Sequence, residues 1–274
     1  MSETITLKET AERLGVHYMT AYRYVRIGKL PAKKVGSSWQ VAVADLEAFT
    51  DEATDPGEAP WSERFESRAL AGDERGSWAV IEAALASGRS PTEVYVDVIG
   101  PAMGRIGRSW ARGTTTIAEE HAATAVAGRI VGRLSNRFTA PGRRRGRIVI
   151  GTPPGERHGL PVTMAADLLR GVGFEVVDLG CDLPIDAFVH GVRTHLPVTV
   201  VAVSITSTGS APMAHRLVSA LHQSGLGPVV LGGNGVSGSE QATALGGDAH
   251  AATIADLADY ADRVKLSGPG YLVS

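Results

Sequence analysis

The fold of the second half of this chain is decided by the stretch Ile148-Val-Ile-Gly-Thr-Pro-Pro-Gly-Glu-Arg-His158-Gly-Leu-Pro161. Its apolar beginning, Arg147 to Ile150, predicts a buried strand, and its Gly/Pro-rich middle predicts a loop. The Ala/Leu-rich sequence from about Val162 to Gly171 predicts a helix. A strand, a loop and a helix in this order open a doubly wound α/β unit, in which ligands bind at the carboxyl ends of the strands.

Within the predicted loop, Glu156 stands two residues before His158. A metal-ligating histidine is usually oriented through its other ring nitrogen by a carboxylate, so this pair can supply both a ligand and its support. A Glu-x-His pair in a loop is by itself more often solvated polar surface. Whether Glu156 and His158 form a metal site therefore depends on the motifs at the ends of the later strands.

Two later strands end in small or polar residues. Val198–Val203 is followed by Ser204-Ile205-Thr206, and Pro228–Leu231 is followed by Gly232-Gly233. Glu-x-His-x-x-Pro, Ser-x-Thr and Gly-Gly at successive strand ends resemble the cobalamin-binding domain of methionine synthase, mutases and corrinoid proteins. The pattern of that family is Asp-x-His-x-x-Gly, Ser-x-Leu and Gly-Gly, and the resemblance runs from residue 147 to about residue 260.

The resemblance implies a role for each motif residue. His158 would be the lower ligand of the cobalt, with Glu156 as its carboxylate partner. Ser204 would line the cleft that receives the nucleotide tail, and Gly232-Gly233 would let the backbone approach that tail closely. Thr206 begins a hydroxyl-rich loop suited to hydrogen-bonding the same tail.

Composition places the whole chain among globular proteins with one large domain or two to three small domains. It has 274 residues, 43% of them hydrophobic, and a net charge of -2, which excludes a globally basic nucleic-acid coat but not a small basic module. Cys181 is the only cysteine, so no disulfide forms within the chain, as is usual in a reducing cytoplasm. No signal peptide opens the sequence and no apolar run approaches a membrane-spanning length. We expect a cytoplasmic protein.

The first segment, residues 1–50, has the pattern of a winged helix-turn-helix. Thr6 can cap a helix that carries Leu7, Ala11 and Leu14 on one face, and a second helix is expected from His17 to Ile27. Two short strands around Gly36-Ser37 would form a wing, and a helix would close the domain. This order resembles the MerR and excisionase-like families, and an acidic Pro/Gly-bearing linker, residues 51–60, follows it.

The second helix and the wing carry the predicted DNA contacts. Between Arg23 and Lys34 the sequence has five basic residues and no acidic one, a patch that would neutralise phosphates. Side chains near the start of the helix would reach base edges. A protein-binding helical module is the alternative reading of this segment. The candidate DNA-binding residues are Tyr18, Thr20, Arg23, Arg26, Lys33 and Lys34.

Residues 61–140 have the pattern of a four-helix bundle. The expected helices are Ser62–Ala71, Glu74–Ala86, Pro91–Ala111 and Ile117–Phe138, and a break of the third helix at Pro101 is the alternative to a continuous one. Trp110, followed after nine residues by Glu120-His121, resembles the helical cap of the cobalamin-dependent light-sensing repressors (the CarH/LitR group). That resemblance implies that these three residues lie over the upper face of the corrin and enclose an adenosyl group. The alternative is an ordinary core tryptophan beside a solvated helix turn.

The predicted fold class is therefore a winged helix-turn-helix, a four-helix cap and a Rossmann-like cobalamin-binding domain over residues 141–274. The arginine run at residues 143–147 is expected to be a solvated hinge between the last two. The expected function is a transcriptional regulator that senses light through adenosylcobalamin, as a dimer or tetramer on a DNA operator. The alternatives are a corrinoid methyl carrier and a light-independent sensor of cobalamin or another tetrapyrrole. No nucleophile–base–acid set appears in the sequence, so we expect no enzyme activity.

Overall fold

The computed structural model of the chain describes residues 4–13, 21–22, 25, 30–35, 38–46 and 60–266. It divides into two compact units, Met1–Pro60 and Trp61–Ser274, which are described separately. In the part of the chain covered by these ranges, no helix is long and apolar enough to cross a membrane.

The N-terminal unit contains a small antiparallel sheet beside a capped helix. Strands β1 (Thr4–Thr6), β2 (Lys33–Val35) and β3 (Ser38–Ala42) pair in the order β1-β3-β2. Helix α1 (Leu7–Arg13) begins as expected at Thr6, whose hydroxyl accepts a hydrogen bond from the Glu9 amide at 3.3 Å. The two strands of the expected wing are present, whereas β1 was not predicted. It is too short to give a periodic signal.

Most of the predicted DNA-contacting residues lie outside the described ranges. These are Tyr18, Thr20, Arg23 and Arg26. Lys33 and Lys34 are described, and both are exposed on β2, paired in register with Gln40 and Trp39 of β3. The phosphate-binding patch therefore stays a prediction, supported in the described residues by these two lysines.

The second unit begins with an antiparallel set of helices. They are α4 (Trp61–Leu70), α5 (Glu74–Ala86), a continuous helical run over residues 91–111, and α8 (Ile117–Leu134) with a 3-10 turn, η2 (Ser135–Arg137). The starts agree with the predicted ranges to within one residue. The last helix ends earlier than predicted, at Leu134, because η2 tightens its final turn. Glycines in left-handed conformation, such as Gly72 (φ 67°) and Gly88 (φ 102°), end the first two helices.

The third helical run does not break at Pro101. It passes from α6 (Pro91–Glu93) through a π-helical segment, η1 (Val94–Ile99), into α7 (Gly100–Ala111). The Gly100 amide donates to the carbonyl of Tyr95, five residues back. Proline has no N–H to offer the carbonyl four residues before it, and the π-helical turn accommodates that interruption within one continuous helical run.

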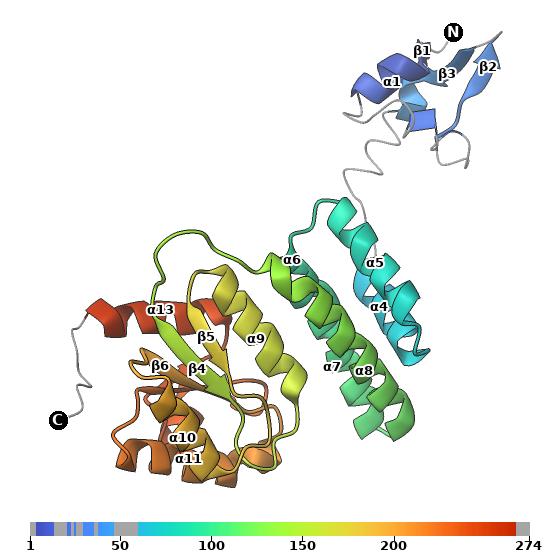
Figure 1. Ribbon diagram of the computed structural model, residues 1–274. Coiled ribbons are helices and arrows are strands. Elements are labelled where there is room, and N and C mark those ends of the chain that lie inside the picture. Colours follow the sequence, from blue (N-terminus) through green and yellow to red (C-terminus); the bar gives the residue numbers. More distant parts are fainter. Residues whose placement is uncertain are drawn as a thin grey trace. The chain divides into compact units, whose positions relative to one another are not determined.

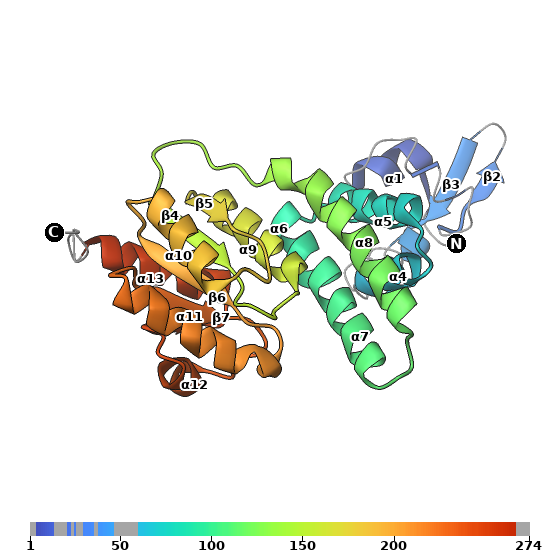
Figure 2. The same cartoon turned by 60° about the horizontal axis from the view of Figure 1, so that its bottom comes forward.

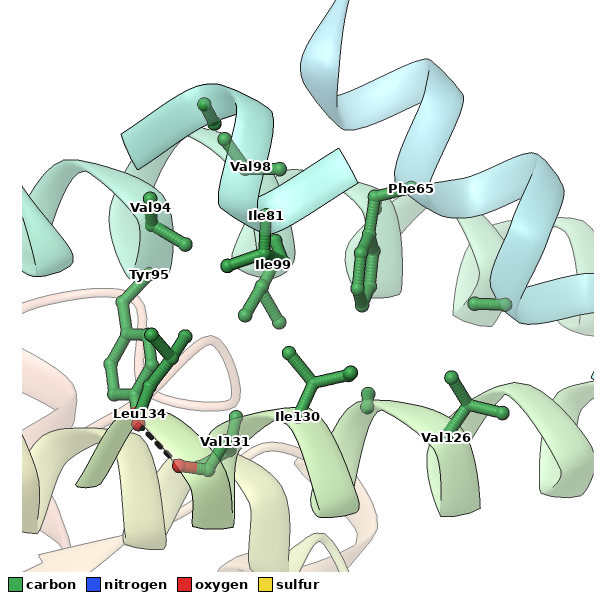
Figure 3. Close-up of a cluster of buried hydrophobic side chains, with 14 of the residues drawn as sticks. Phe65, Ile81, Val94, Tyr95, Val98, Ile99, Val126, Ile130, Val131 and Leu134 are labelled. Carbon is green, nitrogen blue, oxygen red and sulfur yellow. Dashed lines mark hydrogen bonds between the residues drawn. The ribbon is translucent and has the colours of Figure 1, made fainter. Parts of the chain in front are cut away.

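The helical bundle is held by a continuous apolar core. Figure 3 shows Phe65 and Ile81 from the first two helices facing Ile130 and Val131 of α8, with Tyr95 at one end of the cluster. All of these side chains are at most 1% exposed. Leu160, Met164 and Leu168 of the next domain add a partly buried stripe to this core.

The α/β part is a five-stranded parallel sheet in the order β5-β4-β6-β7-β8. Its strands are β4 (Arg147–Gly151), β5 (Glu175–Asp178), β6 (Val200–Ser204), β7 (Val229–Gly232) and β8 (Ala249–Ala251). Each of its pairings is parallel, so the predicted doubly wound α/β fold is confirmed. The last strand, β8, was not predicted because it has three residues and no apolar run.

Helices cover both faces of this sheet (Figure 1). Val149 and Val201 face α10 (Ile185–Thr194) and α11 (Ala211–Gln223), whereas Ile148 and Val200 face α9 and α13. Successive strand residues thus serve opposite cores, which explains why these strands are apolar at every position. Helix α9 covers Gly159–Gly171 and α13 covers Ile254–Leu266, and a short helix, α12 (Ser239–Ala244), precedes β8.

The arginine run is only partly a solvated hinge. Arg145 donates to Asp262 at 2.6 Å and to the Val172 carbonyl at 3.1 Å, and its guanidinium lies 4.6 Å from the centre of the Phe174 ring. Arg147 donates to Glu175 at 3.0 Å. Arg143 and Arg144 are exposed, as predicted. The segment is therefore anchored at its C-terminal end, because these aliphatic stems pack on the domain while their charges find carboxylates.

Candidate functional site

The candidate site lies at the point in the parallel sheet where the strand order reverses. From β4 the chain moves to β5 on one side, and β6 lies on the other side of β4. The loops after β4 and β6 diverge at this switch point, which is where open α/β sheets bind ligands. Residues 152–158 follow β4 and residues 205–210 follow β6, so the tertiary structure brings two predicted motifs to one place.

Glu156 lies at the centre of these two loops with only 1% of its surface exposed. Its Oε2 accepts hydrogen bonds from the amides of Thr206 at 2.9 Å and Ser207 at 2.8 Å, and from the Ser210 hydroxyl at 3.1 Å. Its Oε1 accepts from the His158 amide at 3.2 Å and is bonded to His158 Nδ1. Both carboxylate oxygens are thus fully used by donors.

These donors keep Glu156 ionised. Burial by itself raises the pKa of this carboxyl, but the bonds from the Ser207 amide, the His158 ring and amide, and the Thr206 amide outweigh it. The pKa of Glu156 therefore lies below its usual value. An ionised carboxylate only accepts hydrogen bonds, so His158 Nδ1 carries the proton in this pair.

His158 presents its other nitrogen outward. Its side chain is 55% exposed, and it stands immediately before α9 without capping that helix. With the proton on Nδ1, Nε2 has a free lone pair, which is the form that a metal-ligating histidine requires. Pro161, which differs from the glycine of the family pattern, falls in the first turn of α9, where proline is well accommodated.

The loop that carries His158 is fastened to the loop after β5. The Asp182 carboxylate accepts from the Gly155 amide at 2.6 Å, and the Asp182 amide donates to the Thr152 hydroxyl at 2.9 Å and to the Glu156 carbonyl at 3.0 Å. Asp182 itself has a left-handed backbone (φ 56°), which costs conformational energy outside glycine. Asp182 was not among the predicted site residues, because only the fold brings it beside the loop that carries His158.

The remaining cleft residues are brought to the same edge of the sheet. Ser204 ends β6 opposite Gly232 in register. A Cβ on Gly232 would lie 2.8 Å from the Ala251 carbonyl, and one on Gly233 would lie 2.4 Å from the Ile205 carbonyl. Both glycines are thus required by the close approach of neighbouring backbone, whether or not a ligand tail also passes there. Of the hydroxyl-rich loop, Ser210 points inward to Glu156 rather than to a ligand.

The three cap residues gather where α7 ends and α8 begins. Trp110 is 49% exposed, so the alternative of a core tryptophan is wrong. His121 Nδ1 lies 2.8 Å from Glu120 Oε2, and Thr124 donates to Glu120 Oε1 at 2.9 Å. Buried positions of α8 begin only at Ala123, which leaves its first turns free to face a ligand.

The cap residues and His158 lie at matching ends of two neighbouring helices. In Figures 1 and 2, α8 and α9 run side by side with their N-terminal ends on the same side. Within the described residues, no hydrogen bond or ion pair joins the cap residues to Glu156 or His158. The fold therefore places the cap residues and His158 at the same end of this helix pair.

The donor set fits a metal that arrives in its own macrocycle. No group of three or more His, Cys, Asp or Glu side chains in the described ranges could hold a bare ion. One free imidazole nitrogen, backed by a buried carboxylate, is instead what a single axial ligand needs. His158 would hold the cobalt of a cobalamin from below.

Family comparisons agree with this chemistry. Residues 61–135 and residues 146–258 each match a model described as a B12 binding domain. Residues 4–54 match a model described as a helix-turn-helix domain. The matches support cobalamin binding by this chain and a helix-turn-helix segment at its beginning.

Two curated relatives are named for the corrinoid. Trimethylamine corrinoid protein 1 of Methanosarcina acetivorans is 27% identical over 139 residues, 50% of this chain and 64% of that protein. Trimethylamine corrinoid protein 1 of Methanosarcina mazei is 30% identical over 128 residues, 46% of this chain and 59% of that protein. The chain thus spans less than two thirds of the length of these relatives.

A solved structure shares the fold. The monomethylamine corrinoid protein of Methanosarcina barkeri superposes with a TM-score of 0.64 at 19% identity, covering 74% of this chain and 98% of that one. At 19% identity this likeness shows the fold alone. Light sensing and the adenosyl form of the cofactor stay predictions.

Proposed function

We propose that this chain binds a cobalamin with His158 Nε2 as the lower axial ligand. The observation that carries the proposal is the pairing of His158 Nδ1 with the buried, ionised Glu156, which leaves Nε2 of this exposed side chain as the ring nitrogen available to a metal. Glu156 holds the ring in place, and the loop after β6 holds Glu156. Trp110, Glu120 and His121 would cover the opposite face of the corrin.

When bound, cobalamin supplies a cobalt–carbon bond whose upper group can be transferred or lost. The residues of this chain bind and orient the cofactor. His158 would hold the cobalt through its Nε2, and Trp110, Glu120 and His121 would restrict the access of water to the bound cofactor. We propose accordingly that the chain carries the cofactor and has no enzyme activity of its own.

The ligand assignment is tested by absorption spectroscopy of the chain loaded with cobalamin. His158→Ala should convert the spectrum from a histidine-ligated form to a form without a lower nitrogen ligand, or abolish binding. His222→Ala is the matched control, because His222 also pairs with a carboxylate, Asp248, at 2.9 Å but lies far from the loop after β4 in the sequence. A histidine-ligated spectrum that survives in His158→Ala would contradict the assignment.

Carriage of a methyl group for a partner methyltransferase is the first candidate for what the bound cobalamin does. The names of the curated relatives, and their matches over about half of this chain, favour it. In this role the helical cap would have to yield to a partner that delivers or removes the methyl group.

Regulation of transcription is the second candidate, and the helix-turn-helix match at residues 4–54 favours it. Carriage of a methyl group does not require a helix-turn-helix module. In this role the chain would bind adenosylcobalamin in the dark, as a dimer or tetramer on an operator. Light, or depletion of the cofactor, would then change its oligomeric state and its hold on DNA.

One experiment separates these roles. DNA affinity of the full chain is measured without cofactor, with adenosylcobalamin in the dark, and after green light, with gel filtration of each sample. Cofactor-dependent DNA binding favours the regulator, and light dependence with a change in size favours the photoreceptor.

Absence of DNA binding in all three states, or binding unaffected by replacing Lys33 and Lys34 with alanine, would contradict the DNA-binding role of this segment and favour the carrier. Removal of two phosphate contacts should reduce the steepness of the plot of log binding constant against log salt concentration by about two.

A further inference from the structure

Asp167 is completely buried in α9 although it carries a carboxylate. It accepts hydrogen bonds from the Tyr95 hydroxyl, the Ser135 hydroxyl and Arg170 Nη1, each at 2.9 Å. Tyr95 and Ser135 belong to the helical bundle, whereas Arg170 belongs to α9 itself. Two of the three donors therefore cross from the bundle to the α/β domain.

The surroundings of Asp167 are tightly packed. The Tyr95 ring centre lies 4.5 Å from that of Phe138, and a Cβ on Gly171 would lie 3.3 Å from Phe138 Cδ1. The Tyr95 hydroxyl also lies 3.1 Å from the Val131 carbonyl (Figure 3). Burial, with Asp167 adding to it, raises the pKa of Tyr95, so its hydroxyl stays protonated and remains a donor.

This junction lies at the end of the two helices remote from the candidate site. In both Figure 1 and Figure 2, α8 and α9 are closer together at their C-terminal ends and diverge toward their N-terminal ends. Helix α9 starts immediately after His158, and the first turns of α8 carry Glu120 and His121. The angle between the helices therefore bears on the distance between His158 and the cap, together with the packing of Leu160 on the bundle core.

We propose that Asp167, Tyr95 and Ser135 form a junction that fixes the angle between α8 and α9, and so the space between His158 and the cap. These are positioning residues, since they act through the helices. A buried carboxylate is stable only where hydrogen-bond donors surround it, because each donor that moves away leaves part of its charge without a partner. The carboxylate of Asp167 therefore favours the one helix arrangement that keeps its donors in place. The purpose of the junction rests on the proposed cobalamin site, but its effect on spacing is measurable without cofactor.

The test compares the full chain with the double variant Tyr95→Phe/Ser135→Ala, which removes both crossing hydroxyls. Nitroxide labels are placed on Ala118→Cys in α8 and Glu240→Cys in α12, both exposed, in a Cys181→Ser background. The distance distribution is measured by double electron–electron resonance. We expect one narrow distance for the parent and a broader or shifted distribution for the double variant. Ser135→Ala alone, as a milder change, should broaden it less.

Arg170→Met is the matched control, because it removes the donor that lies within α9 and keeps both crossing bonds. Its distribution should equal that of the parent. A double variant as narrow as the parent would overturn the junction. Equal broadening in the double variant and in Arg170→Met would also overturn it, since general loosening of α9 would then explain the result.

Cobalamin release supplies an independent readout. The double variant should keep a histidine-ligated spectrum while releasing the cofactor about tenfold faster, as expected if roughly 1.4 kcal/mol of restraint is lost. Unchanged release with a lower unfolding temperature would show that the junction serves stability alone. A parent that binds no cobalamin would contradict the proposed function, while the distance measurement would still decide the junction.

Discussion

Glu156 has to be an acceptor at both oxygens, because every one of its partners is a donor. Glu156→Gln keeps the size of the side chain but turns one acceptor into an N–H₂ group that faces donors. We expect the free energy of unfolding in urea to fall by about 2–3 kcal/mol, the cost of leaving buried polar groups unsatisfied. The cobalamin spectrum should also lose its histidine-ligated features.

Glu156→Asp is the control, since it keeps the charge and matches the residue of the family pattern. It should retain a histidine-ligated spectrum. Equal stability of the Gln and Glu chains would mean that the amides of the loop after β6 do not depend on the carboxylate.

Two buried serines of the helical bundle make a second comparison. Ser77 Oγ has no hydrogen-bond partner, whereas Ser62 donates to the Val98 carbonyl at 2.9 Å and accepts from Arg105 at 2.8 Å. Ser77→Ala should raise the free energy of unfolding by up to about 1 kcal/mol, since it removes an unsatisfied hydroxyl and improves helix propensity. Ser62→Ala should lower it by about 1–2 kcal/mol. Denaturant unfolding of both variants checks this, and a destabilised Ser77→Ala chain would contradict the first expectation.

At the scale of elements, η1 is the segment in which the third helical run changes from α-helical to π-helical hydrogen bonding. A Cβ on Gly100 would lie 3.1 Å from the Tyr95 carbonyl, whereas one on Gly107 in the same helix would meet nothing within 4 Å. Gly107→Ala should therefore stabilise the chain by about 0.5–1 kcal/mol through helix propensity. Gly100→Ala should bring no such gain, leaving a difference of about 1 kcal/mol between the variants in thermal or urea unfolding. Equal gains would mean that α7 relaxes to a regular helix.

The same segment explains why the helix continues through Pro101, the position at which the sequence left a break open. Pro101 indicates a break when only the local sequence is considered. The buried side chains of η1, which include Val94, Tyr95, Val98 and Ile99, instead keep both halves of the helix on one core. Packing of these residues outweighs the one backbone hydrogen bond that proline removes, so the helix continues through a π-helical turn.

At the scale of the whole molecule, the hydrogen bonds described above for the candidate site, taken over the described residues, join residues of the unit Trp61–Ser274. A fragment of these residues should therefore bind cobalamin with the affinity and spectrum of the full chain, while it should lose any affinity for DNA. Equilibrium titration of fragment and full chain with cobalamin checks this. Loss of cobalamin binding in the fragment would show that the N-terminal unit contributes to the site.

Much of this architecture could be predicted because its signals are local. The apolar runs ending in Ser204 and Gly232 predicted parallel strands, and the helix starts in the bundle followed from the amphipathic spacing of their residues and the glycines between them. The pairing of Glu156 with His158 was predictable for the same reason, since two residues in one short loop are necessarily close.

What the sequence determined by itself is the set of elements and the short motifs at their ends, since backbone preference and hydrophobic periodicity act within a few residues. What only the tertiary structure decided is which motifs meet. The strand order places the loop of Ser210 against Glu156, and the left-handed Asp182 against the loop of His158. The packing of the helical bundle on α9 also brings Asp167 within hydrogen-bond distance of Tyr95, which is 72 residues away in the sequence. Such contacts depend on the whole fold, because a buried charge is satisfied by whatever donors packing brings near it, at any separation along the chain.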